Sequence, residues 1–278
     1  MLYTDSSLRG TMKSHYYCSQ CLVKQVVRTC ELATENKELR ERAVIESMKF
    51  LGSFNLEMTP SYFGSEIQKI VKNITKNKDP YRKYKERSTE FGEKMVRKLR
   101  INNIETALRA ALTANSIDYG GDKIIEYKKT FEEMMNSKIV IDQSKKLFEE
   151  IKNAEKIVYF FDNAGEAVFD KKFISFFESE IVVIGKKSPM YNDITASELK
   201  KMGFKNVLDC GDNTGVLKID KNLEKELKSS DLIISKGQAN FESLPELWKN
   251  IFYLFKVKCR PMSEYLNLPI GSDLVLKI

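Results

Sequence analysis

The sequence has little cysteine or histidine, and it contains no long hydrophobic run. Five of its 278 residues are cysteines and one is a histidine. An odd number of cysteines argues against a disulfide scaffold. No apolar run approaches the roughly 20 residues that a membrane-spanning helix needs, and residues 1–18 lack the apolar segment of a secretion signal. These absences predict a cytoplasmic protein that does not span a membrane.

Positive charge exceeds negative charge, but the excess is spread out. The net charge is +7. Residues 1–150 carry 27 Lys and Arg against 21 Asp and Glu, whereas residues 151–278 carry 19 against 18. In stretches such as YRKYKERSTEFGEKMVRKLR, basic residues are interleaved with glutamates, which is typical of a solvated helix face. The charge pattern therefore argues against nucleic acid binding.

The first half of the chain has the periodicity of helices. Thr59-Pro60 and Asp79-Pro80 are typical of helix starts, with a capping side chain followed by a first-turn proline. Apolar residues recur at helical spacing in SYFGSEIQKIVKNIT, IETALRAALTANS, KIIEYKKTFEEMMN and SKKLFEEIKNA. Residues 1–153 are therefore predicted to form a helical subdomain.

From residue 156 the pattern changes to short apolar runs that alternate with helical segments. The runs are KIVYFF, IVVIG, NVLD, DLIIS, IFYLFKV and LVLKI. Such alternation indicates βαβ units and a mainly parallel sheet covered on both faces. We therefore predict an α/β fold, a three-layer α/β/α Rossmann-like sandwich over residues 154–278. The helical residues 1–153 would pack on it and contribute to its site, so that the chain forms one integrated unit.

Polar residues follow three of the predicted strands. They are Asp162, Asn163 and Glu166 after KIVYFF, Asp193 after IVVIG, and Lys236, Gly237 and Asn240 at the end of DLIIS. Ligands bind to open α/β sheets beyond the carboxyl ends of the strands. These residues are therefore candidates for a single site, although any one cluster alone would also suit a solvated loop.

The chemical types of these residues indicate a hard metal ion beside a phosphate. Asp162, Asn163 and Asp193 offer oxygen ligands without histidine or cysteine, which suits Mg²⁺ or Mn²⁺ better than zinc. Lys236 offers a fixed positive charge, and the Gly237 segment offers backbone N–H groups to a phosphate. The alternative is that Lys236 is an ordinary surface lysine.

Other polar residues are weaker candidates for substrate binding. Glu166 and Asp170 lie in the first turn of a predicted helix, where the helix dipole alone favours acids. Asn115 and Asp118 end an apolar helix before two glycines. An ordinary capped helix end would explain that arrangement equally well.

Cysteines near the N-terminus raise the question of a second metal. His15, Cys18 and Cys21 follow one another at three-residue steps. A zinc or iron site would need a fourth ligand, and a second C-x-x-C is missing. Reduced thiols packed on a helix are the alternative to a metal site on Cys18 and Cys21.

Several motifs together resemble the damage-control phosphatase family, also called acidic-residue methyltransferase 1-like. They are TPSYFGSEI, DPYRKYK, ANSIDYGG, FFDNAGE, SPMYNDIT and SKGQANFESL, and they occur in the family's order. The pair Cys18 and Cys21 resembles the archaeal branch rather than the sugar-phosphate branch. The latter has one more residue within DNAGE and an Arg-rich substrate motif, and neither is evident in this chain.

The resemblance implies a divalent metal held by Asp162, Asn163 and Asp193, with Mg²⁺ or Mn²⁺ expected and Co²⁺ or Ni²⁺ as alternatives. It implies a substrate phosphate near Lys236 and hydrolysis of a small phosphorylated metabolite, damaged or surplus. The nucleophile would be a metal-bound water or Asp162 itself. Phosphatases of the haloacid-dehalogenase type use an aspartate, but they require a second Asp two residues later, where this chain has Ala164.

Two other functions compete with a phosphatase. LDCGDNTG superficially resembles a glycine-rich loop of an S-adenosylmethionine-dependent methyltransferase, but it lacks a G-x-G core. A non-catalytic module that binds a phosphorylated ligand would have the same sequence features. An oxidoreductase is disfavoured because no G-x-G-x-x-G opens a βαβ unit.

Overall fold

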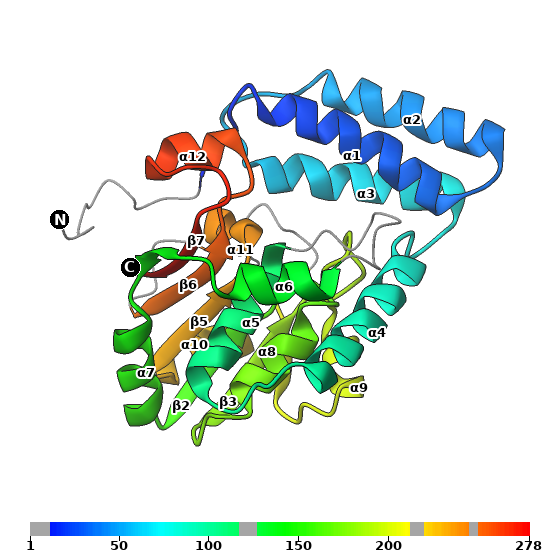
Figure 1. Ribbon diagram of the computed structural model, residues 1–278. Coiled ribbons are helices and arrows are strands. Elements are labelled where there is room, and N and C mark those ends of the chain that lie inside the picture. The colour runs from blue at the N-terminus through cyan, green and yellow to red at the C-terminus, as the bar shows by residue number, and fades with distance from the viewer. Residues whose placement is uncertain (1–11, 117–126, 212–219, 245–249) are drawn as a thin grey trace.

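The computed structural model describes residues 12–116, 127–211, 220–244 and 250–278. A layer of three helices lies above a larger α/β part (Figure 1). The layer consists of α1 (Cys18–Ala33), α2 (Lys37–Leu51) and α3 (Pro60–Thr75). It has a hydrophobic core of its own, which includes Leu22, Val26, Phe63 and Ile67.

The starts of the first helices follow from their sequences. Thr59 caps α3 by accepting a hydrogen bond from the Tyr62 N–H, and Pro60 occupies the first turn, as predicted. The helix α4 (Arg82–Lys98) begins just after Asp79-Pro80 and runs down from the three-helix layer along the α/β part (Figure 1).

A seven-stranded sheet forms the centre of the α/β part, in the order β1-β7-β6-β5-β2-β3-β4. Neighbouring strands from β6 to β4 are parallel, β7 is antiparallel to β6, and β1 is parallel to β7. The strands are β1 (Ile139–Asp142), β2 (Lys156–Phe160), β3 (Glu180–Gly185), β4 (Val207–Asp209), β5 (Leu232–Lys236), β6 (Ile251–Lys256) and β7 (Asp273–Lys277). The predicted α/β fold with a mainly parallel sheet is confirmed.

Helices cover both faces of the sheet. One hydrophobic core joins the strands to the helices from α4 to α9, and a second core joins the opposite face to α10, α11 and α12. The bounds are α5 (Ile104–Ser116), α6 (Tyr127–Met135), α7 (Ser144–Asn153), α8 (Ala167–Ile174), α9 (Ala196–Lys201), α10 (Lys221–Ser229), α11 (Gln238–Ser243) and α12 (Arg260–Leu266).

The first half of the chain is not purely helical. Residues 139–142 form β1, which pairs with β7, and the sequence analysis did not predict this strand. Hydrophobic packing also groups α5 and α7 with the sheet rather than with α1–α3. The division at residue 153 stays a prediction, but the sheet begins before it.

Within the described residues, no helix is both long and apolar enough to cross a membrane.

Candidate functional site

The two loops that carry the predicted metal ligands lie side by side. Asp162 and Asn163 come directly after β2, and Asp193 follows β3, the next strand of the sheet. Asn163 and Asp193 face each other in an antiparallel bridge, and the Ile194 N–H donates to the Asp162 carbonyl at 2.9 Å. The structure therefore brings together the three residues that the sequence predicted as ligands.

Buried charge at this edge of the sheet is out of balance. Four acids and two lysines are each at most 8% exposed, namely Asp162, Glu166, Asp170, Asp193, Lys186 and Lys236. If all were ionised, they would carry an excess of two negative charges, to which the buried Glu242 of α11 would add a third. Buried charges need partners of opposite sign, so this donor set fits an oxygen-ligated divalent metal.

The burial and close spacing of these acids raise their pKa values. Burial, with smaller contributions from Glu166 and Asp193, raises the pKa of Asp162 to about 7. Burial likewise raises the pKa of Asp193, against the opposing effects of Lys186 and Lys85. Both carboxylates resist ionisation, and a cation placed between them would favour the charged form.

We expect the metal-free protein to lose stability as pH rises from about 5 to 8. Burial raises the pKa values of Asp162, Asp170 and Glu242 to about 7. In this window the folded protein holds protons that the unfolded chain has released, so the free energy of unfolding falls with pH. Thermal unfolding at several pH values in EDTA measures this, and excess Mn²⁺ should restore stability most at pH 8. A thermal unfolding temperature that rises with pH in EDTA would contradict the expectation.

Lys236 is not placed as a free phosphate ligand. Its ammonium is fully buried and donates to Glu166 Oε1 at 2.5 Å, Asp170 Oδ1 at 2.7 Å and the Ala111 carbonyl at 3.1 Å. These carboxylates raise the pKa of Lys236 despite its burial. Lys236 therefore neutralises two acids beneath the ligand loops, and it is not the surface lysine of the alternative interpretation.

Glu166 and Asn115 belong to the same buried network. Asn115 Nδ2 donates to Asp162 Oδ2 at 3.1 Å and to Glu166 Oε2 at 2.9 Å. Asn163 Nδ2 donates to the same two oxygens at 3.0 and 3.2 Å. The N-terminal half thus contributes Asn115 to the site, while Asp118 lies outside the described residues.

Gly237 and Asn240 shape the site from the end of β5. Gly237 has φ +84, and a Cβ there would lie 2.2 Å from the Asp162 Cγ. Asn240 Nδ2 donates to the Phe161 carbonyl at 3.0 Å and the Lys236 carbonyl at 2.8 Å. Gly237 therefore packs closely against Asp162 and Asn240 supports the loop, while their contact with a substrate stays a prediction.

Sequence reasoning missed Lys186, a buried lysine at the end of β3. Its ammonium lies 3.7 Å from Asp193 Oδ2 and donates to Asn240 Oδ1 at 3.2 Å. The segment after IVVIG reads KKSPMY, and its first lysine could have been assigned to the site because it directly follows a strand of the predicted sheet.

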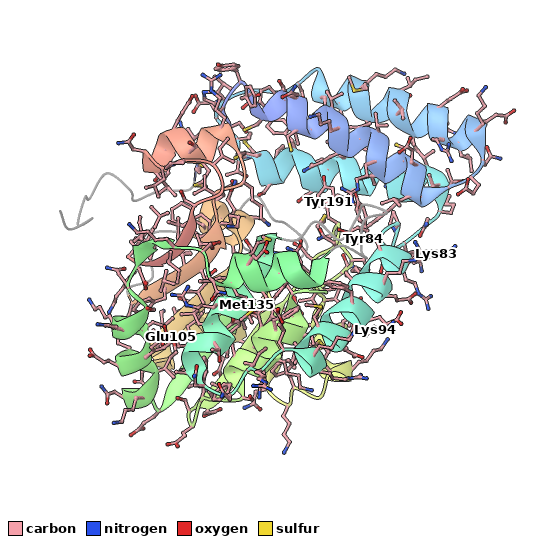
Figure 2. The ribbon with its side chains drawn as sticks, viewed as in Figure 1. Lys83, Tyr84, Lys94, Glu105, Met135 and Tyr191 are labelled. Atoms are coloured by element: carbon pink, nitrogen blue, oxygen red, sulfur yellow. The ribbon has the colours of Figure 1, made fainter. Side chains whose placement is uncertain are left out.

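A cavity of about 540 Å³ opens beside the ligand loops. Its lining combines Asp193 and Tyr191 with residues of α1, α3, α11 and the segment around Lys258. Figure 2 shows Tyr191 between the three-helix layer and the α/β part, where its hydroxyl donates to Gln25 Oε1 at 2.8 Å and the Gly64 carbonyl at 2.9 Å. We call this space the interlayer cavity.

Cys18 and Cys21 line the interlayer cavity together with Cys259. Burial raises the pKa of each of these thiols, which disfavours the thiolate that a metal would need. Within the described residues, no group of three or more His, Cys, Asp or Glu side chains is arranged to hold a metal. A second metal on Cys18 and Cys21 stays a prediction.

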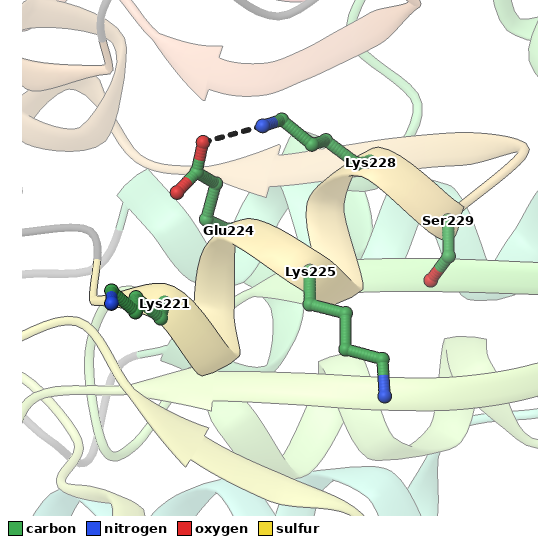
Figure 3. Close-up of a pocket in the computed structure, with 5 residues that line it drawn as sticks. All are labelled: Lys221, Glu224, Lys225, Lys228 and Ser229. Atoms are coloured by element: carbon green, nitrogen blue, oxygen red, sulfur yellow. Dashed lines mark hydrogen bonds and ion pairs between the residues drawn. The ribbon is translucent and has the colours of Figure 1, made fainter.

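A second hollow lies on the outer surface of α10. It is lined only by residues of that helix, including Lys221, Lys225 and Lys228 (Figure 3). Lys228 pairs with Glu224 one turn away at 2.6 Å. None of the ligand-loop residues lines it, so it is a solvated helix face rather than part of the site.

Comparison with known proteins decides the family. A family profile described as the damage-control phosphatase ARMT1-like domain matches residues 14–274. The chain belongs to this family. The predicted family and the phosphatase class that came with it are thereby confirmed.

Relatives in archaea match almost the whole chain. A damage-control phosphatase from Pyrococcus horikoshii is 35% identical, over 94% of this chain and 96% of its own. An uncharacterized protein from Methanocaldococcus jannaschii is 29% identical over 94% of both chains. A damage-control phosphatase from Archaeoglobus fulgidus is 25% identical, over 96% of this chain and 99% of its own.

A solved structure supports the same assignment. The crystal structure of a DUF89 family protein from Pyrococcus horikoshii superimposes with a TM-score of 0.87 at 33% identity. It covers 96% of this chain and 99% of its own. The chain therefore shares the architecture of that DUF89 family protein over nearly its whole length.

Proposed function

We propose that this phosphatase depends on a divalent metal held by Asp162, Asn163 and Asp193, and that it hydrolyses a small phosphorylated metabolite. The observation that carries the proposal is that two buried acids, Asp162 and Asp193, come together at the ends of β2 and β3. Of these residues, Asp193 lines the interlayer cavity. The cavity volume of about 540 Å³ is in the range of small-molecule sites.

Mg²⁺ or Mn²⁺ suits this donor set because its ligands would be two carboxylates and one amide oxygen. Such an ion supplies positive charge to phosphoryl oxygens and lowers the pKa of water. Other residues of the chain hold and neutralise the ligand side chains. Asn115 holds Asp162 in place, Lys186 balances Asp193, and Lys236 neutralises the acids underneath.

Lys258 is better placed than Lys236 to bind the substrate phosphate. It is exposed and lines the interlayer cavity together with Asp193. Its positive charge also lowers the pKa values of Asp162 and Asp193, against the larger effect of their burial. A phosphate in the cavity would therefore lie between the metal ligands and Lys258.

Phosphate release from a panel of phosphorylated metabolites tests the proposed function. We expect the purified protein to hydrolyse at least one of them with Mg²⁺, Mn²⁺, Co²⁺ or Ni²⁺, and EDTA should abolish the activity. Activity that persists undiminished in EDTA would remove the metal from the mechanism. Binding of a phosphorylated ligand without turnover would favour a non-catalytic module.

Replacing Lys258 by alanine should lower kcat/KM about 10- to 100-fold. The reason is that a charge-assisted hydrogen bond contributes roughly 1.5–3 kcal/mol. Steady-state kinetics measures this. Lys225→Ala, on the outer face of α10 (Figure 3), is the matched control and should change nothing. Equal kinetics for Lys258→Ala and the unmodified protein would take Lys258 out of the phosphate site.

A further inference from the structure

The helix α4 is linked to both loops that carry the predicted metal ligands. One face of this helix is buried along its length and contains Lys85, Ser88, Gly92 and Met95. The helix follows α3 in the chain and runs down beside α8 (Figure 1). None of its residues lines the interlayer cavity. None is a candidate metal ligand either, so its links to the loops call for a separate explanation.

Contact with the first loop is made by backbone packing. A Cβ on Gly92 would lie 2.7 Å from the Gly165 carbonyl oxygen, and a Cβ on Gly165 would lie 2.7 Å from the Ser88 Cβ. Only glycine at both positions permits this approach. Gly165 comes two residues after Asn163, so α4 limits where the loop with Asp162 and Asn163 can lie.

The second loop is reached indirectly, through a buried ion pair between α4 and α9, the helix that follows this loop. Lys85 is 2% exposed, and its ammonium lies 2.8 Å from Glu198 Oε1 and 2.9 Å from Asp79 Oδ2. The other oxygen of Glu198 accepts hydrogen bonds from the Thr195 N–H at 2.8 Å and hydroxyl at 2.7 Å. Thr195 comes two residues after Asp193.

These contacts form a continuous chain from α4 to a metal ligand. Glu198 and Thr195 make a reciprocal capping box at the start of α9, and Lys85 holds the free oxygen of that box. The segment from Asp193 to Thr195 is therefore fixed at its far end by Lys85 and at its near end by the bridge to Asn163.

Resting on the proposed function, we infer that Lys85 is a positioning residue for the divalent metal. It acts through Glu198 and Thr195 to hold Asp193 in ligand geometry, while Gly92 holds the opposite loop. Groups that orient metal ligands without touching the ion typically change metal affinity about 10- to 100-fold when they are lost. Lys72 on α3 also contacts this loop, at the Pro189 carbonyl, but Lys85 acts on the side of Asp193 that leads into α9.

Calorimetric titration of the purified protein with Mn²⁺ tests this inference, at a temperature where each variant is shown to be folded. We expect Lys85→Met to weaken Mn²⁺ binding at least about tenfold, and Lys85→Arg to restore most of it. Lys94→Met is the matched control, since Lys94 lies exposed on the same helix and pairs with Glu90 (Figure 2). A change in KM and kcat alone, without a change in Mn²⁺ affinity, would contradict the inference.

Two further variants keep the test decisive if Lys85→Met does not fold. Glu198→Gln breaks the ion pair but keeps an oxygen for Thr195, and Gly92→Ala displaces the first loop without changing charge. Each should also weaken Mn²⁺ binding. Affinity within twofold of the unmodified protein in all folded variants overturns the inference alone, whereas no Mn²⁺ binding by the unmodified protein overturns the proposed function and the inference with it.

Discussion

Asp162→Asn and Asp193→Asn should each reduce turnover by orders of magnitude and weaken Mn²⁺ binding. Both replacements nearly preserve side-chain shape, so they remove negative charge from a ligand rather than packing. The two residues come from loops that bridge each other beside one cavity, and both carboxyl groups are buried. Calorimetry and phosphate-release kinetics measure the two effects separately.

The double replacement distinguishes one shared site from two unrelated acids. Residues that act as a unit are not additive, so the double variant should lose much less than the sum of the single losses. Asp209→Asn is the control, because Asp209 also ends a parallel strand and its carboxylate accepts a hydrogen bond from the Gly211 N–H at 3.1 Å rather than facing the ligand loops. Full activity in Asp193→Asn would disprove the site as described.

The same variants separate the two candidate nucleophiles. If water attacks the phosphoryl group, Asp162→Asn should lose metal affinity and turnover together. If Asp162 attacks directly, turnover should vanish while Mn²⁺ affinity is retained. The position two residues later is Ala164, which is buried and offers no acid.

Gly237→Ala should abolish activity, because the added methyl group would overlap the Asp162 carboxylate. The new Cβ would lie 2.2 Å from both Cγ and Oδ2 of Asp162, and φ at this position is +84. The Asp162 carboxylate could move aside only by giving up its hydrogen bonds from Asn115 and Asn163. We expect kcat/KM to fall more than about 100-fold, together with Mn²⁺ affinity, since ~1 Å of misplacement at a reacting group has an effect of that size.

Gly271→Ala isolates the backbone contribution to that effect. Gly271 has φ +93, and a Cβ there would meet nothing within 4 Å. Alanine at this position should lower the free energy of unfolding by roughly 1–2 kcal/mol, because a residue with a Cβ is strained in the left-handed conformation. The kinetics should stay unchanged. If Gly237→Ala behaved like Gly271→Ala in both unfolding and kinetic measurements, the close approach to Asp162 would have no functional meaning.

Local patterns were sufficient to predict most of the fold and the ligand loops. Six apolar runs predicted as strands are all strands in the sheet, because buried parallel strands give uninterrupted runs of β-branched and aromatic residues. Asp162, Asn163 and Asp193 could be joined in advance because the carboxyl ends of parallel strands share one edge.

Long-range pairing explains what local patterns could not predict. The strand Ile139–Asp142 is short and half-exposed, and its place in the sheet depends on β7 at the far end of the chain.

Lys236 was predicted to face a phosphate because it ends a strand beside a glycine. Its true partners, Glu166 and Asp170, lie on another element, and nothing in the local sequence indicates which way a buried lysine points.

The separate core of α1–α3 has a consequence for how such proteins diversify. These helices form one wall of the interlayer cavity, yet their packing does not rely on the sheet. Residues such as Lys24 and Ser61 can therefore be exchanged over evolutionary time without disturbing the strands that present Asp162 and Asp193. A substitution on that wall would change the shape of the cavity, whereas the opposite wall would keep the same ligand residues.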